Sequence, residues 1–216
     1  MWGLVLKDML LLKKYWLKAK YTVTLLLIII LSLIFLKESS MIVAIFITML
    51  LLNSVQILFI DDNKSGWTTF LHATTNLKAE KIVLGRYTVA ITIIIFANLL
   101  FFSLNLIIDF LYPSLSLKGV MLLGIVVLSI SLLYMLVLIP FTYLFEQNGM
   151  IYTFLFFIIT GFLLSNINNI DSIAAQFMNE KNNFYLISLG IIGLMIVSFV
   201  SYIFSVLIYK RRFMNQ

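Results

Sequence analysis

The side chains that most often perform catalysis are scarce in this 216-residue sequence, and they do not cluster. The only histidine, His72, has no second histidine or cysteine near it, so neither a metal site nor a histidine-assisted nucleophile is indicated. We interpret His72 as an ordinary surface or interface residue. A P-loop of the form G-x-x-x-x-G-K-[ST] is also missing, so the chain is not predicted to hydrolyse ATP. The sequence predicts no catalytic residue, no metal ligand and no cofactor on this chain.

The composition instead indicates an integral membrane protein. Apolar residues make up 62% of the chain and charged residues 11%, and the mean hydropathy is +1.10. Polar side chains are too few to cover a surface in water. Six apolar runs have about the length of a spanning helix: residues 21–36, 41–60, 82–111, 119–145, 150–165 and 184–209. We therefore predict one all-α domain over residues 1–216 with six transmembrane helices.

Lysine and arginine predict the orientation of these helices. With a cytoplasmic N-terminus, all but three of the 15 basic residues lie inside, the exceptions being Lys37, Lys118 and Lys181. Both termini are then cytoplasmic, and residues 166–183 form an extracellular segment. The net charge of +6 reflects this topology and does not indicate a nucleic-acid partner. The charged first 20 residues do not have the form of a cleavable signal peptide.

Residues 1–20 are predicted to form an amphipathic helix in the membrane interface. One face carries apolar and tryptophan side chains, Trp2, Val5, Met9, Leu12 and Trp16, and the opposite face carries Lys7, Lys14 and Lys18. Tryptophan and lysine in this arrangement suit an anionic headgroup layer. The helix either anchors the first span or contacts a partner subunit.

Residues 61–81 form the most polar connection. Gly66 permits a sharp turn, and Trp67, Phe70 and Leu71 then give a short cytoplasmic helix an apolar face. Asn76 is the expected N-cap of the next helix, with an acidic residue in its first turn. Large apolar side chains favour a rigid binding element over a solvated loop.

Neutral polar residues recur inside the predicted spans. Asn98, Asn105 and Asp109 share one face of the third span, and Asn53 and Gln56 share one face of the second. Such side chains either pack helices together or line a pathway for a substrate. Ionisable groups deep in the bilayer, which mark ion-driven carriers, are nearly absent from the spans. Pro140 and the glycines of the sixth span indicate a kink and close helix packing.

The pattern resembles the type-two permeases of ABC exporters. The resemblance is carried by Leu6-Lys7-Asp8 in the first helix and by the loop that runs from Asp62-Asn63-Lys64-Ser65-Gly66-Trp67 to Gly85-Arg86-Tyr87. It is nearest to small permeases of Gram-positive bacteria, including those that export phenol-soluble modulins. The loop departs from the pattern at Thr74-Thr75-Asn76-Leu77, where a proline usually precedes a basic residue.

The resemblance implies a permease that pairs with a second copy or a paralogue. Its loop, at about residues 66–76, would act as a coupling helix on a separate ATPase, which binds the ATP and magnesium. The substrate would be an amphipathic molecule such as a small peptide. The alternatives are a permease of a bacteriocin-immunity system and a structural membrane subunit that transports nothing.

Overall fold

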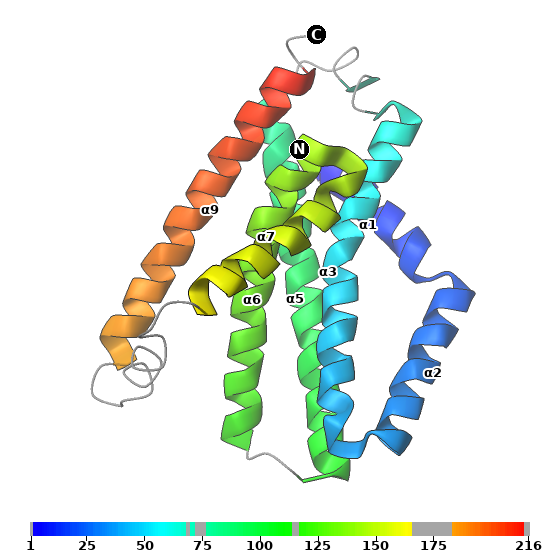
Figure 1. Cartoon of the computed structure of the whole chain (residues 1–216). Coiled ribbons are helices and arrows are strands. Elements are labelled where there is room, and N and C mark those ends of the chain that lie inside the picture. The colour runs from blue at the N-terminus through cyan, green and yellow to red at the C-terminus, as the bar shows by residue number, and fades with distance from the viewer. Residues whose placement is uncertain (1, 68–69, 72–76, 114–116, 166–182, 214–216) are drawn as a thin grey trace. The chain divides into compact units, whose positions relative to one another are not determined.

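Helices form all of the regular structure in the part of the chain that the computed structural model describes, residues 2–67, 70–71, 77–113, 117–165 and 183–213 (Figure 1). The all-α class is thus confirmed for those residues. Four stretches are long and apolar enough to cross a membrane, residues 37–65, 79–111, 119–163 and 190–213. The first two helices would form a fifth span if they are counted as one span bent by 65°. Six separate crossings therefore stay a prediction.

The chain divides into two compact units, residues 1–135 and 136–216. The helices of the first unit are α1 (Trp2–Trp16), α2 (Ala19–Phe35), the short η1 (Lys37–Ser39), α3 (Ser40–Ser65), α5 (Ala79–Leu111) and the N-terminal part of α6 (Leu117–Phe145). Of these, α2, α3, α5 and α6 follow the first four apolar runs of the sequence, and α1 lies within the predicted amphipathic segment 1–20.

Two helices of the first unit continue beyond their apolar runs at the polar end. Helix α3 extends five residues past position 60, and α5 begins at Ala79, before its apolar run starts. Glu80 occupies the first turn of α5, as expected for an acidic residue near the positive end of a helix dipole. The N-cap is Lys78, which makes no side-chain capping bond, so the prediction of Asn76 as the cap was wrong.

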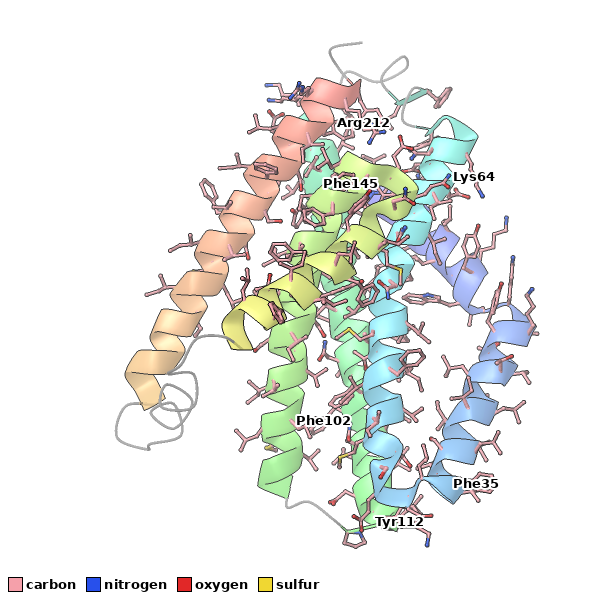
Figure 2. All side chains as sticks on the ribbon, in the orientation of Figure 1. Phe35, Lys64, Phe102, Tyr112, Phe145 and Arg212 are labelled. Carbon is pink, nitrogen blue, oxygen red and sulfur yellow. The ribbon has the colours of Figure 1, made fainter. Side chains whose placement is uncertain are left out.

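Helices α3 and α5 pack side by side as the centre of the first unit (Figure 1). Ala44, Phe101 and Val127 join α3, α5 and α6 in a buried core. Helix α1 packs against α5 and α3, and it buries Val5 and Leu12. Lys64 marks one end of this unit and Tyr112 the opposite end (Figure 2).

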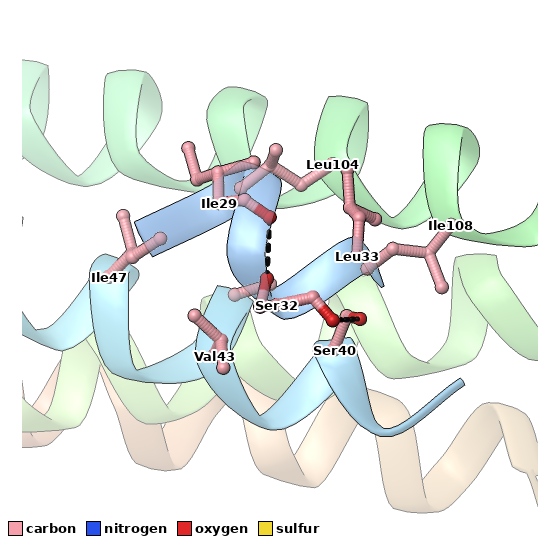
Figure 3. Close-up of a pocket in the computed structure, with 9 residues that line it drawn as sticks. Ile29, Ser32, Leu33, Ser40, Val43, Ile47, Leu104 and Ile108 are labelled. Carbon is pink, nitrogen blue, oxygen red and sulfur yellow. Dashed lines mark hydrogen bonds between the residues drawn. The ribbon is translucent and has the colours of Figure 1, made fainter. Parts of the chain in front are cut away.

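Helix α2 is attached to the first unit mainly near its C-terminal end. It buries only one residue, Ser32, and the hydroxyl of Tyr112 donates to the carbonyl of Leu33 at 2.9 Å. A small pocket between α2, α3 and α5 is lined by Ile29, Ser32, Leu33, Ser40, Val43, Ala44, Ile47, Leu104 and Ile108 (Figure 3). Its two serine hydroxyls donate to backbone carbonyls, at 2.8 Å to Ile29 and 2.9 Å to Ser32. The pocket therefore presents an apolar wall.

The second unit contains the end of α6, the turn η2 (Glu146–Asn148), α7 (Gly149–Ser165) and α9 (Asn183–Phe213). Gly149 begins α7 where the backbone of Thr142 passes very close. A Cβ atom at position 149 would lie 2.6 Å from the Cα atom of Thr142. The turn between α6 and α7 therefore requires glycine at this position.

Pro140 interrupts the hydrogen bonding of α6, since proline has no N–H to donate to the carbonyl four residues earlier. That carbonyl belongs to Leu136, and it accepts a hydrogen bond from the hydroxyl of Ser201 in α9. A serine of a neighbouring helix thus satisfies the group that the proline leaves free, as membrane helices require. Near its end, α9 also places Arg212 on the last turn of α6, where Arg212 donates to the carbonyls of Tyr143 at 2.7 Å and Leu144 at 3.2 Å.

Candidate coupling site

The connection after α3 begins with a left-handed turn at Gly66. Its φ of 65° is strained for residues with a Cβ atom, and its N–H bonds to the carbonyl of Asp62. The N–H of Phe70 then donates to the carbonyl of Gly66 at 3.0 Å, as in a helical turn. The structure thus supports the predicted turn and the start of a short helix after it.

The three large apolar residues that follow Gly66, namely Trp67, Phe70 and Leu71, differ in exposure. Phe70 is 55% exposed, whereas Leu71 is only 5% exposed. Trp67 is half-buried, with its ring 5.6 Å from the ring of Phe70. Of the three, Phe70 therefore has the exposed side chain, and Leu71 is buried against the protein. Asn76, the remaining predicted coupling residue, lies outside the described residues.

Four charged side chains meet beside this connection in a closed ring, which we call the charge ring. It contains Lys7 and Asp8 of α1, Asp62 of α3 and Arg86 of α5. Arg86 binds Asp8 at 2.8 Å and also binds Asp62. Lys7 lies 3.3 Å from Asp8 and also binds Asp62. Each cation therefore touches both carboxylates, and the ring joins three helices.

Aromatic rings cover both cations of the charge ring. The guanidinium of Arg86 lies 4.8 Å from the ring centroid of Phe59, and the amine of Lys7 lies 4.8 Å from the ring of Trp67. Such cation–π contacts are worth about 0.5–2 kcal/mol each, depending on desolvation. Trp67, which follows Gly66 at the start of the candidate coupling helix, thus contacts the charge ring directly through Lys7.

Burial sets the energetics of the charge ring. Asp8, Asp62 and Arg86 are all buried. Burial raises the pKa of Asp8, which lies outside the predicted spans, while the nearby Arg86 and Lys7 act in the opposite direction. A closed set of alternating charges offsets much of the cost of removing them from water, whereas a set with one member missing does not.

Sequence reasoning did not identify the charge ring as a site. It assigned Lys7 to the polar face of an interfacial helix and named Asp8, Asp62 and Arg86 only as parts of a family resemblance. One signal was available, since Asp8 falls between Val5 and Leu12 on the face that α1 buries. An aspartate on a buried face needs a cationic partner.

The other predicted anchors of α1 lie in varied surroundings. Trp2, Lys14 and Lys18 are exposed. The amine of Lys18 lies 5.1 Å from the ring of Tyr15. Trp16 instead stacks on Phe96 of α5, with ring centroids 5.5 Å apart. Helix α1 is thus both a docked helix of the first unit and the carrier of exposed lysines.

The predicted pathway residues lie farther along the helices, and the structure does not bring them to the charge ring. Asn98 is 12 residues from Arg86, which corresponds to about 18 Å along a helix. Asn105 and Gln56 are buried, and Asn98 and Asp109 are partly buried. Asn53 accepts a hydrogen bond from the hydroxyl of Tyr134 in α6.

The long apolar helices, together with a match to a family of membrane transporters, make this chain a multi-pass protein of the plasma membrane. The chain belongs to the ABC-2 family of transporter proteins, whose family model matches residues 3–210. Membership makes this chain a transmembrane permease subunit and implies an ABC ATPase as its partner. No curated protein matches the chain, and no solved structure does either.

Proposed function

We propose that this chain is the permease subunit of an ATP-driven exporter, with six spans and both termini in the cytoplasm. The distribution of lysine and arginine along the sequence supports this orientation. The residue 61–81 connection then faces the cytoplasm, where an ATPase can reach it. Two permeases, either identical or paralogous, would form the transmembrane pathway, and a separate ATPase would supply the energy.

The observation that carries the proposal is the contrast within the 61–81 connection. Phe70 is exposed on a short element whose neighbours, Leu71 and Trp67, are held by the protein. Exposed aromatic residues on an ordered support are typical anchors of protein interfaces. Phe70 is therefore proposed as the residue that inserts into the ATPase.

The charge ring gives this docking element a mechanical connection to the bundle. A displacement at Trp67 acts on Lys7, and the ring passes it to α1, α3 and α5 together. Buried ion pairs with two partners each are stiff compared with exposed single pairs. Motion of the ATPase would thus move three helices as one body.

The proposed substrate is an amphipathic molecule, such as a small helical peptide of the phenol-soluble modulin type, that moves outward. Support comes from spans that combine large apolar surfaces with a few amide side chains and almost no charge. Such a lining suits a molecule with one apolar face better than an ion or a sugar. A permease of an immunity system would share all of these features.

Purification of the tagged permease from membranes of its own cells tests the proposal. We expect an ATPase that is labelled by a photoreactive ATP analogue to co-purify with the wild-type chain. Phe70→Ala should reduce its retention about 30-fold, because loss of an anchor costs about 2 kcal/mol.

Phe110→Ala is the matched control, since Phe110 is 86% exposed and lies at the other end of α5. It should retain the ATPase fully. Absence of any ATP-binding partner from the wild-type preparation would favour the structural-subunit alternative. Full retention by Phe70→Ala would place the docking surface elsewhere on the permease.

A further inference from the structure

Within the described part of the chain, Asn98 and Asn105 on α5 each form a hydrogen bond through the side-chain nitrogen but not through the side-chain oxygen. The side-chain nitrogens of Asn98 and Asn105 donate to the carbonyls of Ile94 and Phe101 in their own helix, each at 2.9 Å. Both side-chain oxygens are buried, and neither has a hydrogen-bond donor among the described residues. The two residues are seven positions apart, so they lie on nearly the same line along the helix.

Exchanging the nitrogen and oxygen of either amide does not remove the problem. The oxygen would then face the carbonyl of Ile94 or Phe101, and the nitrogen would lose its acceptor. One half of each amide is therefore unsatisfied in both orientations. Asn105 is 2% exposed, so water does not reach it in this conformation.

Asn53 shows what an asparagine that packs helices together does in the same unit. Its oxygen accepts a hydrogen bond from Tyr134, and the bond joins α3 to α6. Asn98 and Asn105 make no comparable bond to another helix among the described residues; each bonds to the carbonyl four residues earlier in α5. The sequence left two interpretations of the amide residues open, helix packing and lining of a pathway. Asn53 fits helix packing, whereas Asn98 and Asn105 do not.

An unsatisfied amide oxygen is costly inside a membrane, because lipid offers no donor in place of water. A helix that needed only to pack would be more stable with leucine at these two positions. Polar groups that reduce the stability of one conformation are typical of positions that function in another.

We propose that Asn98 and Asn105 form a line of hydrogen-bond acceptors along the export pathway, which is closed in the conformation described here. Their partners would be the N–H or O–H donors on the polar side of the amphipathic substrate, with water in their place when the substrate is absent. This inference rests on the proposed exporter function and adds to it the position and the polarity of the pathway. A substrate rich in amide or amine donors fits such a line, whereas one that carries only acceptors does not.

Single cysteines test the proposal, and the natural chain has no cysteine to interfere. We expect Asn98→Cys and Asn105→Cys to react with a water-soluble maleimide in vesicles that contain the permease and its ATPase. ATP should change their labelling rates by about tenfold or more, as expected when a minor open state becomes the main one. Ile93→Cys is the matched control, because Ile93, at 1% exposed, is as buried as Asn105 but lies about 120° around the helix from it. It should stay unreactive with and without nucleotide.

A second measurement needs neither ATPase nor substrate. Asn105→Leu removes an unsatisfied group, so the thermal midpoint of the purified permease should rise by about 2–4 °C. Asn53→Leu should lower the midpoint, since it deprives Tyr134 of its acceptor. A lower midpoint for Asn105→Leu would show that its amide has a partner inside the protein, and this result would overturn the proposal.

Unreactive cysteines at both α5 positions in every nucleotide state would also overturn it. That outcome leaves the proposed function intact if the ATPase still co-purifies through Phe70. Loss of the ATPase from the wild-type complex would instead count against the exporter function itself. The two failures are therefore distinguishable.

Discussion

Each unit of the molecule has one arginine that ties its helices together, but the two sites are built differently. In the first unit, Arg86 binds two carboxylates, and the exposed fractions of the Arg86 and Asp8 side chains are 9% and 6%. In the second, Arg212 binds one carboxylate, Glu146, with side chains 31% and 40% exposed, and it also caps α6. Water screens the second pair and not the first. The contrast indicates that the charge ring is a buried link between helices, whereas Arg212 makes a partly exposed surface contact.

The largest effect in this comparison is expected at Arg86. Arg86→Met leaves Asp8 and Asp62 buried with Lys7 as the one remaining cation of the charge ring, and breaking a buried ion pair in this way costs about 3–5 kcal/mol. We expect a strong loss of folded permease in detergent, measured by the thermal midpoint and by the yield of monodisperse protein.

Arg86→Lys separates geometry from charge. A lysine amine lacks the planar fork that lets Arg86 reach Asp8 and Asp62 at once, so we expect only partial recovery of the thermal midpoint. Wild-type stability of Arg86→Met would contradict the view of the charge ring as a buried link between helices.

An intermediate effect is expected at Pro140 and Ser201 in the second unit. Ser201→Ala leaves the carbonyl of Leu136 unsatisfied and should cost about 1 kcal/mol, the usual range for polar contacts between membrane helices. In the Pro140→Ala background the restored N–H can bond to that carbonyl, so Ser201→Ala should then cost almost nothing. Thermal unfolding of the four proteins in this double-mutant cycle gives the coupling, and equal costs in both backgrounds would rule it out.

The smallest effect is expected at the exposed arginine. Arg212→Met removes a partly exposed ion pair and two hydrogen bonds to the end of α6, which together are worth about 1 kcal/mol or less. Added salt should weaken the contribution of Arg212 and leave that of Arg86 nearly unchanged. If Arg212→Met lowered the thermal midpoint as much as Arg86→Met, the distinction between a buried link and a surface contact would fail.

The sequence predicted the helices far better than the contacts between them. Apolar runs located α3 and α5 to within a few residues, because the length of an apolar stretch is a local property. Gly66 was predicted as a sharp turn for the same local reason. The charge ring was not predictable in this way, since Asp8 and Arg86 are 78 positions apart and meet only through the packing of α1 on α5.

The amide residues show the same limit. Their periodicity correctly indicated which ones share a face of one helix. It could not distinguish Asn53, which bonds to another helix, from Asn105, which bonds to its own. That difference depends on which side chain of a neighbouring helix stands opposite, and a hydropathy pattern does not contain this information.

The charge ring also has a consequence for how the chain is assembled during synthesis. Asp8 and Asp62 leave the ribosome before Arg86 does, so until α5 is made Lys7 is the only ring cation available to the two carboxylates. Charges without partners stay in contact with water. Helix α1 is therefore expected to dock only after α5 has entered the membrane. In this order of events the synthesis of α5, and not that of α1, completes the charge ring and the packing of the N-terminal helix.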